Sequence, residues 1–149
     1  MRDAALVHEV RAVAAAESPP EQRAQRIAEL VRTRTGRRWV GVYRIDSDEV
    51  VNLAWSGPAA PAYPRFPADR GLTGAAIESR GPVVSNDVAQ DPRYLTALAS
   101  TGSELIAPVV VDGRVVGTLD VEDGRTDAFD REDEALFVEL AGALHGLYA

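Results

Sequence analysis

The chain has 149 residues with a formal net charge of −7, and it contains no cysteine. This length predicts one domain with a core of its own, and the 46% hydrophobic and 26% charged residues are typical of a globular protein. The lack of cysteine excludes disulfides, thiolate nucleophiles and iron–sulfur or thiolate zinc sites.

Charge and hydropathy argue against nucleic acid and membranes as binding partners. An acidic chain is a poor match for nucleic acid, and no apolar run reaches the ~20 residues that span a membrane. His8 and His145 are the two histidines and lie near opposite ends, so we expect neither a metal centre nor another cofactor. We expect a cytoplasmic protein that binds neither nucleic acid nor a membrane.

Two helices are predicted at the start of the chain, over residues 2–17 and 20–35, because apolar residues recur at helical spacing. Ser18, followed by two prolines and then Glu21, predicts a capping box at the start of the second helix. Gly36 is expected to end it.

The predicted core, residues 38–146, then begins with two strands, "RRWVGVYRI" and "EVVNLAWS". Residues 57–70 contain four prolines and read as a long surface loop, of the kind that often covers a site. There follow a short helix in "GLTGAAIES", a strand in "PVVSN" and a helical turn in "DPRY" capped by Asp91.

The last part of the chain predicts a hairpin and a long helix. Asp112-Gly113 is a strong two-residue turn signal between "ELIAPVVV" and "RVVGTLDV", and Asp130 is expected to cap the final helix. The hairpins indicate an antiparallel sheet with the terminal helices on one face and the short helices and loops over the other. The expected fold class is therefore an α+β sandwich.

Acidic side chains share one face of a predicted strand. Because successive strand residues point to opposite faces, Asp120 and Glu122 lie on one side and Leu119 and Val121 on the other. In an acidic chain, these two residues and Glu104 can simply be solvent-exposed acids at the ends of strands. Alternatively, they form the floor of a pocket that binds a cation. Without a cation, neighbouring carboxylates raise each other's pKa and at least one retains a proton.

Aromatic residues occupy the matching face of the first strand, where Trp39, Gly41 and Tyr43 alternate with valines. Two aromatics beside a glycine suit a cavity wall or, equally, a core. If they meet the acids, the site favours a cationic group through charge pairing and cation–π attraction of ~0.5–2 kcal/mol.

Three segments resemble the GAF domain family of small-molecule sensors over residues 20–146: "RGLTGAAIESRGPVVSNDVAQDPRY", "SELIAPVVVDGRVVGTLDVED" and "FDREDEALFVELA". The resemblance implies one such domain over residues 1–149, with a helical dimerisation face and a loop-covered pocket on opposite sides of the sheet. "FDREDE" also resembles an element of cyclic-nucleotide-binding GAF domains, but ordinary helix capping explains its acids.

The nearest branch resembles the free methionine-(R)-sulfoxide reductases, through "WVGVY", "RGLTG", "GSELIAPVVVDGRVVG" and "LDVED". This resemblance implies that five residues contact the ligand: Trp39, Tyr43, Glu104, Asp120 and Glu122. It places Tyr63, Thr73 and Ala97 where that branch has cysteines. Sulfoxide reduction needs an attacking thiolate and a resolving thiol, so we expect no catalytic residue, and Thr73 contributes a hydroxyl to the ligand.

These observations support three hypotheses. The first is a non-catalytic sensor module that binds a small amino-acid-like metabolite. The second is a divergent sulfoxide reductase that borrows an external thiol. The third is an interaction module with a vestigial pocket that works as a homodimer through its terminal helices.

Overall fold

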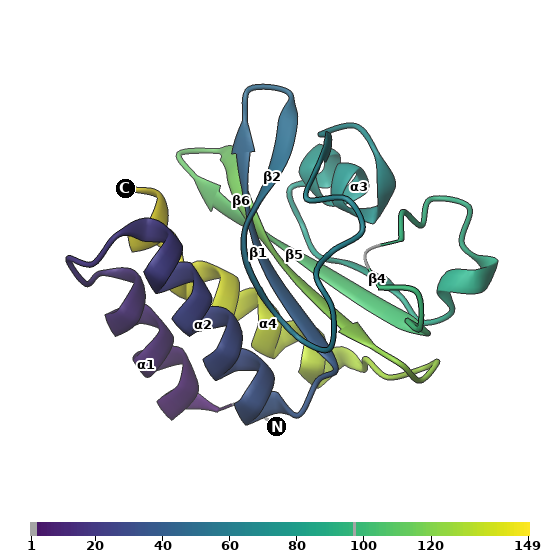
Figure 1. The fold of residues 1–149 in the computed structure, drawn as a ribbon, viewed down its shortest axis with the longest axis horizontal. Coiled ribbons are helices and arrows are strands. Elements are labelled where there is room, and N and C mark those ends of the chain that lie inside the picture. Colours follow the sequence, from purple (N-terminus) through teal and green to yellow (C-terminus); the bar gives the residue numbers. More distant parts are fainter. Residues whose placement is uncertain (1–2, 97) are drawn as a thin grey trace.

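The computed structural model describes residues 3–96 and 98–149, and it is built around a six-stranded antiparallel sheet in the order β3-β2-β1-β6-β5-β4 (Figure 1). The strands are β1 (Trp39–Asp46), β2 (Glu49–Ser56), β3 (Arg65–Pro67), β4 (Val83–Ser85), β5 (Ser103–Val111) and β6 (Arg114–Asp123). The antiparallel pairing follows from the short hairpins that the sequence predicts.

The helices form two unequal layers. They are α1 (Ala4–Ala14), α2 (Pro20–Thr35), α3 (Gly71–Ser79) and α4 (Arg131–Ala143), with 3₁₀ turns η1 (Val88–Gln90) and η2 (His145–Tyr148). Figure 1 shows α1, α2 and α4 on one face of the sheet, and α3 with the long connections on the other. The α+β sandwich expected from the sequence is confirmed. Each helix of the described residues is too short or too polar to span a membrane.

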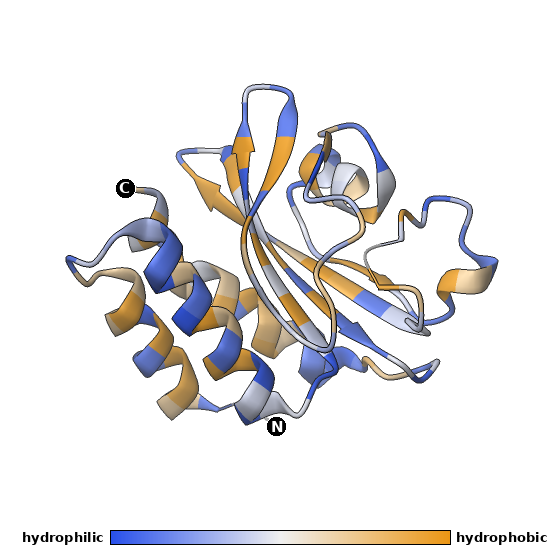
Figure 2. Ribbon diagram, viewed as in Figure 1, coloured by the Kyte–Doolittle hydropathy of each residue, from blue (hydrophilic) through white to orange (hydrophobic). Residues whose placement is uncertain are grey.

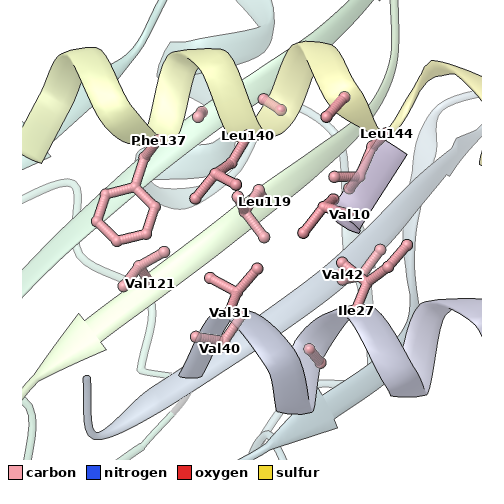
Figure 3. Packing of buried hydrophobic residues seen from close by; sticks show 14 of the residues in the cluster. Val10, Ile27, Val31, Val40, Val42, Leu119, Val121, Phe137, Leu140 and Leu144 are labelled. Atoms are coloured by element: carbon pink, nitrogen blue, oxygen red, sulfur yellow. The ribbon is translucent and has the colours of Figure 1, made fainter. Parts of the chain in front are cut away.

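The main core lies between the sheet and the three-helix layer (Figure 3). On β1, Val40 and Val42 point to this side, as Leu119 and Val121 do on β6. They meet the inner faces of α2 and α4, which Figure 2 shows as hydrophobic stripes on otherwise polar helices. The core residues labelled in Figure 3 are Val10, Ile27, Val31, Val40, Val42, Leu119, Val121, Phe137, Leu140 and Leu144.

The N-terminal helices differ from expectation at their ends. The first is shorter than the predicted 2–17, because Asp3 caps it by accepting a hydrogen bond from the Leu6 amide at 2.9 Å; residue 2 lies outside the described residues. The second has the expected bounds, and Gly36 ends it at φ 69°. The Ser18 capping box is wrong: the extended Pro19 occupies the cap position without a side-chain hydrogen bond, which leaves Glu21 one residue short of the third position.

One further local prediction is wrong and another is confirmed. The stretch 57–70 is not entirely loop, because Phe66 pairs with Val50 and forms the edge strand β3, where proline is tolerated. "DPRY" forms the expected turn capped by Asp91, in which the Tyr94 amide donates to the Asp91 carbonyl at 3.2 Å. The Asp91 carboxylate accepts a hydrogen bond from the Arg93 amide at 3.0 Å and binds the Arg93 guanidinium at 2.8 Å.

The segment before α4 is fixed by local hydrogen bonds. Asp130 and Asp133 form a reciprocal capping box, as the acids of "FDREDE" suggested. The Asn86 side chain clamps the Phe129 backbone, donating to its carbonyl at 3.0 Å and accepting from its amide at 3.1 Å. The hairpin turn Asp112-Gly113 has positive φ at both residues, 51° and 77°, as the predicted two-residue turn requires.

The C-terminal turn η2 rests directly on the sheet. The Tyr148 hydroxyl donates to the Tyr43 carbonyl at 2.5 Å. A Cβ atom at Gly117 would overlap both the Tyr148 ring and the Tyr43 carbonyl, so this position of β6 has no room for a side chain.

Gly117→Ala should therefore lower the free energy of unfolding by about 1–3 kcal/mol, the usual cost of forcing atoms into a packed site. Gly142→Ala is the matched control: this helical position is exposed and an added Cβ meets nothing within 4 Å, so a gain of ~0.5–1 kcal/mol is expected. Urea unfolding measures both. Equal stability of the two variants would contradict the packing described for Tyr148.

A buried carboxylate cluster and the candidate ligand pocket

Three acidic side chains meet on the face of the sheet opposite the main core. Glu104 on β5 is paired directly with Glu122 on β6, and Asp120 lies two residues along the same strand. Their exposed fractions are 3%, 0% and 4%, and carboxylate oxygens of the three lie within 4.8 Å of one another. The alternative of solvent-exposed acids at the ends of strands is therefore wrong. We call Glu104, Asp120 and Glu122 the carboxylate cluster.

The cluster lacks neutralising partners among the described residues. Glu122 Oε1 accepts a hydrogen bond from the Thr101 hydroxyl, whereas Asp120 Oδ1 and Glu122 Oε2 accept none from the described residues as long as all three acids are ionised. A proton on the Glu104 carboxyl allows hydrogen bonds from Glu104 to Asp120 and Glu122. No ion pair of the described part of the chain includes any of the three. Buried carboxylates without partners are strongly penalised in the ionised form.

The pKa values reflect this penalty. Burial, and then the charges of the other two acids, raise the pKa of Glu104 well above its usual range. Burial raises the pKa of Asp120 to about 6, and burial together with the Asp120 charge raises the pKa of Glu122 to about 8. At neutral pH the empty cluster therefore retains protons, as expected for carboxylates without a cation.

A hollow of about 310 Å³, including its open mouth, lies against the cluster. Its floor comes from β1, β5 and β6, and its walls from β3, the start of α3 and the loops around residues 63 and 95. The lining residues are Tyr43, Tyr63, Phe66, Gly71, Leu72, Thr73, Leu95, Thr96, Glu104 and Asp120. Only about 20 Å³ of this space is open to the centre of a water molecule, little more than one water needs, so the walls must move apart to admit a metabolite.

The start of α3 forms part of the wall through Gly71, Leu72 and Thr73. The N-cap residue Arg70 makes no side-chain hydrogen bond to this helix end. The first N–H groups of a helix have no partner within the helix and carry partial positive charge. The hollow therefore joins a positive helix end to a buried acidic cluster.

The predicted site residues separate into two groups. Tyr43, Thr73, Glu104 and Asp120 line the hollow. Trp39 and Glu122 are not among the lining residues. Trp39 is fully buried, and its Nε1 donates to the Ala59 carbonyl at 3.0 Å.

Trp39 supports the wall from behind. A Cβ at Gly41 would overlap the rings of Trp39 and Tyr43, so this glycine lets both aromatics lie close to the sheet. Of the positions where the resembling branch has cysteines, Tyr63 and Thr73 line the hollow, and Ala97 lies outside the described residues.

Sequence reasoning missed six lining residues: Tyr63, Phe66, Gly71, Leu72, Leu95 and Thr96. They come from segments without strand or helix periodicity, except Gly71 and Leu72, which lie in the predicted short helix. Tyr94 is half-buried beside the cluster, and burial followed by the Glu122 charge raises its pKa. Its hydroxyl donates to the Leu98 carbonyl at 3.4 Å.

The cluster can also be considered as a set of metal ligands. Three carboxylate oxygens within 4.8 Å of one another are the donors that hard cations such as Mg²⁺ or Ca²⁺ prefer. Those ions take six or more oxygens, so three side chains would need water to complete the shell. The sequence-based expectation that there is no metal centre stays an expectation.

The profile of the GAF domain family matches residues 19–144. The chain belongs to the GAF domain family. It is 29% identical over 103 residues to GAF domain-containing protein A of Dictyostelium discoideum, a match that covers 68% of this chain and 64% of that protein. The chain thus spans just under two thirds of the length of that relative.

Similarity also extends to the sulfoxide reductases. The free methionine-R-sulfoxide reductase of Escherichia coli (strain K12) is 28% identical over 115 residues, covering 77% of this chain and 68% of that protein. The structure of free methionine-R-sulfoxide reductase from Neisseria meningitidis, in complex with its substrate, superposes with a TM-score of 0.86 at 31% identity. That match covers 96% of this GAF domain and 86% of that chain.

The carboxylate cluster should make the ligand-free domain less stable as pH rises. A carboxyl whose pKa is higher folded than unfolded binds more protons in the folded state, so stability is lost between the unfolded pKa near 4 and the folded values of about 6 for Asp120 and about 8 for Glu122. Thermal midpoints should fall by several degrees from pH 5 to 9.

Glu122→Gln should flatten this dependence, because an amide does not titrate. Glu17→Gln, on an exposed connection, removes the same charge and should leave the slope as in the wild type. Asp91 and Asp123, whose pKa values are lowered, titrate below this window. A wild-type midpoint that stays constant or rises across this range would contradict a protonated cluster.

Proposed function

We propose that this GAF domain binds a small, zwitterionic, amino-acid-like metabolite and performs no chemistry on it. The observation that carries the proposal is Asp120, a buried acid that lines the hollow and has no positively charged partner among the described residues. A ligand that supplies a donor and a positive charge there removes an unfavourable feature of the empty protein.

The cationic end of the ligand would lie at the carboxylate cluster. An ammonium group offers N–H donors to Asp120 and Glu104, both of which line the hollow. Charge-assisted hydrogen bonds of this kind are roughly twice as strong as neutral ones. The Tyr43 ring, in the same wall, adds cation–π attraction.

The anionic end would lie at the start of α3. Gly71, Leu72 and Thr73, the first residues of α3, line that wall, and a helix N-terminus is a favourable place for a carboxylate. Opposite charges at the two ends of a small hollow favour a zwitterion. A phosphate of a cyclic nucleotide would instead be repelled by the acids.

The absence of cysteine supports binding without catalysis. Sulfoxide reduction needs a thiolate and a second thiol, and the chain has none. The hydroxyls of Tyr63 and Thr73, at two of the positions concerned, cannot attack sulfur in their place. The similarity to the reductases is one of sequence and fold, and it supports the proposal of an amino-acid-like ligand. The homodimer through the terminal helices and the cytoplasmic location stay predictions.

A ligand screen by thermal midpoint tests the proposal. The panel holds the free amino acids, both epimers of methionine sulfoxide, and cyclic AMP and GMP. A ligand at ~100 times its Kd adds ~2.7 kcal/mol, so a rise of roughly 5–10 °C is expected with an amino acid and none with a cyclic nucleotide. Asp120→Asn should abolish the rise and Glu17→Gln should keep it.

The pH dependence of affinity identifies which end of the ligand meets the cluster. Glu104, Asp120 and Glu122 face the site together with the tyrosines Tyr43 and Tyr94. An ammonium group displaces protons from the acids, so its affinity should rise from pH 6 to 8. A ligand oxygen that accepts from protonated carboxyls would instead bind more weakly over this range and would contradict the cationic assignment.

An activity assay separates binding from catalysis. With excess dithiothreitol as the external thiol, the chain should not convert free methionine-(R)-sulfoxide to methionine, because no residue can form the sulfur adduct. Amino acid analysis measures the product, with thiol alone as the blank. Turnover above this blank that Asp120→Asn removes would establish the divergent reductase instead.

A further inference from the structure

Three aromatic rings surround the same hollow as the acids. Tyr43, Phe66 and Tyr63 all line it beside Glu104 and Asp120. The rings of Tyr43 and Phe66 meet edge to face, with centroids 6.0 Å apart and planes at 69°. An aromatic wall of this extent exceeds what a primary ammonium requires, since such a group is satisfied by hydrogen-bond acceptors.

Among these three rings, Tyr63 gives the most information about the ligand. It is 49% exposed, and among the described residues Tyr63 and Val138 are the large hydrophobic side chains left exposed. Packing therefore does not explain the Tyr63 ring, which stands at the pocket instead of in the core. Its position is fixed, because the next residue, Pro64, accepts a hydrogen bond from the Asn52 amide at 2.8 Å and holds the loop against β2.

The combination of rings and acids indicates the type of cation. Aromatic faces attract alkylated ammonium groups, whose positive charge is spread over methyl groups that cannot hydrogen bond. Ionised Asp120 is buried, and its Oδ1 then accepts no hydrogen bond from the described residues, so an N–H of the ligand is favourable there. A primary ammonium offers that N–H but presents no methyl group to the rings, and a quaternary one presents methyl groups but offers no N–H.

We propose that the ligand is an N-methylated amino acid whose ammonium keeps at least one N–H, that is, a secondary or tertiary amine. The proposal rests on the function proposed above and specifies its substrate class. The N–H points to Asp120, the methyl groups contact Tyr43, Phe66 and Tyr63, and the ligand carboxylate meets the start of α3. Tyr63 thereby determines specificity and takes no part in chemistry.

Isothermal titration of a methylation series tests this proposal. Glycine, sarcosine, N,N-dimethylglycine and glycine betaine differ only in methyl groups. If the screen identifies a larger amino acid, its N-methyl and N,N-dimethyl derivatives form the series. Sarcosine or dimethylglycine should bind at least about fivefold tighter than glycine and betaine, the scale of a cation–π contact with a partly exposed ring.

Variants at the two exposed hydrophobic positions provide the controls. Tyr63→Leu keeps an apolar side chain but removes the ring, so glycine and dimethylglycine should bind with similar affinity. Tyr63→Phe keeps the ring and should keep the preference. Val138→Ala, on the helical face, should bind like the wild type.

Several results would overturn the inference. It fails if glycine, the primary amine, binds most tightly, or if betaine does. It also fails if Tyr63→Leu keeps the preference for methylated ligands. Each of these results leaves the proposed function intact. If the methylated series fails while the screen finds an unmodified amino acid, the inference alone fails. If neither series nor screen gives binding, both proposals fail.

Discussion

The burial of three carboxyl groups side by side on one face of a sheet is the constraint on which the rest of the structure depends. Glu104, Asp120 and Glu122 are almost completely removed from water, and the described residues supply no positive charge against them. Such an arrangement opposes folding. The continuous apolar layer between the sheet and α1, α2 and α4 offsets it, so the same strands that carry the acids also carry the main core (Figure 3).

The end of β6 shows how strongly neighbouring residues determine whether a buried carboxyl group is ionised. Asp123 directly follows Glu122 but binds Arg37 at 3.2 Å and Arg125 at 3.1 Å. Burial would raise its pKa, but the hydrogen bonds from Arg125 and Arg37 outweigh burial and lower the pKa to about 2. Arg37 also binds Asp133 of α4 at 3.0 Å. One acid thus links the strand to the helical layer, while its neighbour Glu122 belongs to the carboxylate cluster.

Sequence alone predicted the layers of this fold and most of the pocket floor. Alternation along β6 was enough to place Asp120 and Glu122 on one face, because the period of a strand is fixed by its backbone. It could not show that this face is buried, since the cover comes from α3 and the proline-rich loop, which carry little periodic signal. Phe66 was missed for the same reason, and Trp39 was placed in the lining because alternation gives a side but not a depth.

Tyr43 belongs to both faces of the sheet at once. Its ring lines the hollow, whereas its carbonyl holds the hydroxyl of Tyr148 on the helical side. The pairing of β1 with β2 is irregular between Val42 and Tyr43, so the backbone here is not locked into a uniform ladder. A shift of the ring and a shift of the C-terminal turn therefore act on the same peptide unit. Tyr43 thus joins the wall of the hollow and the anchor of the C-terminal turn in a single residue of β1.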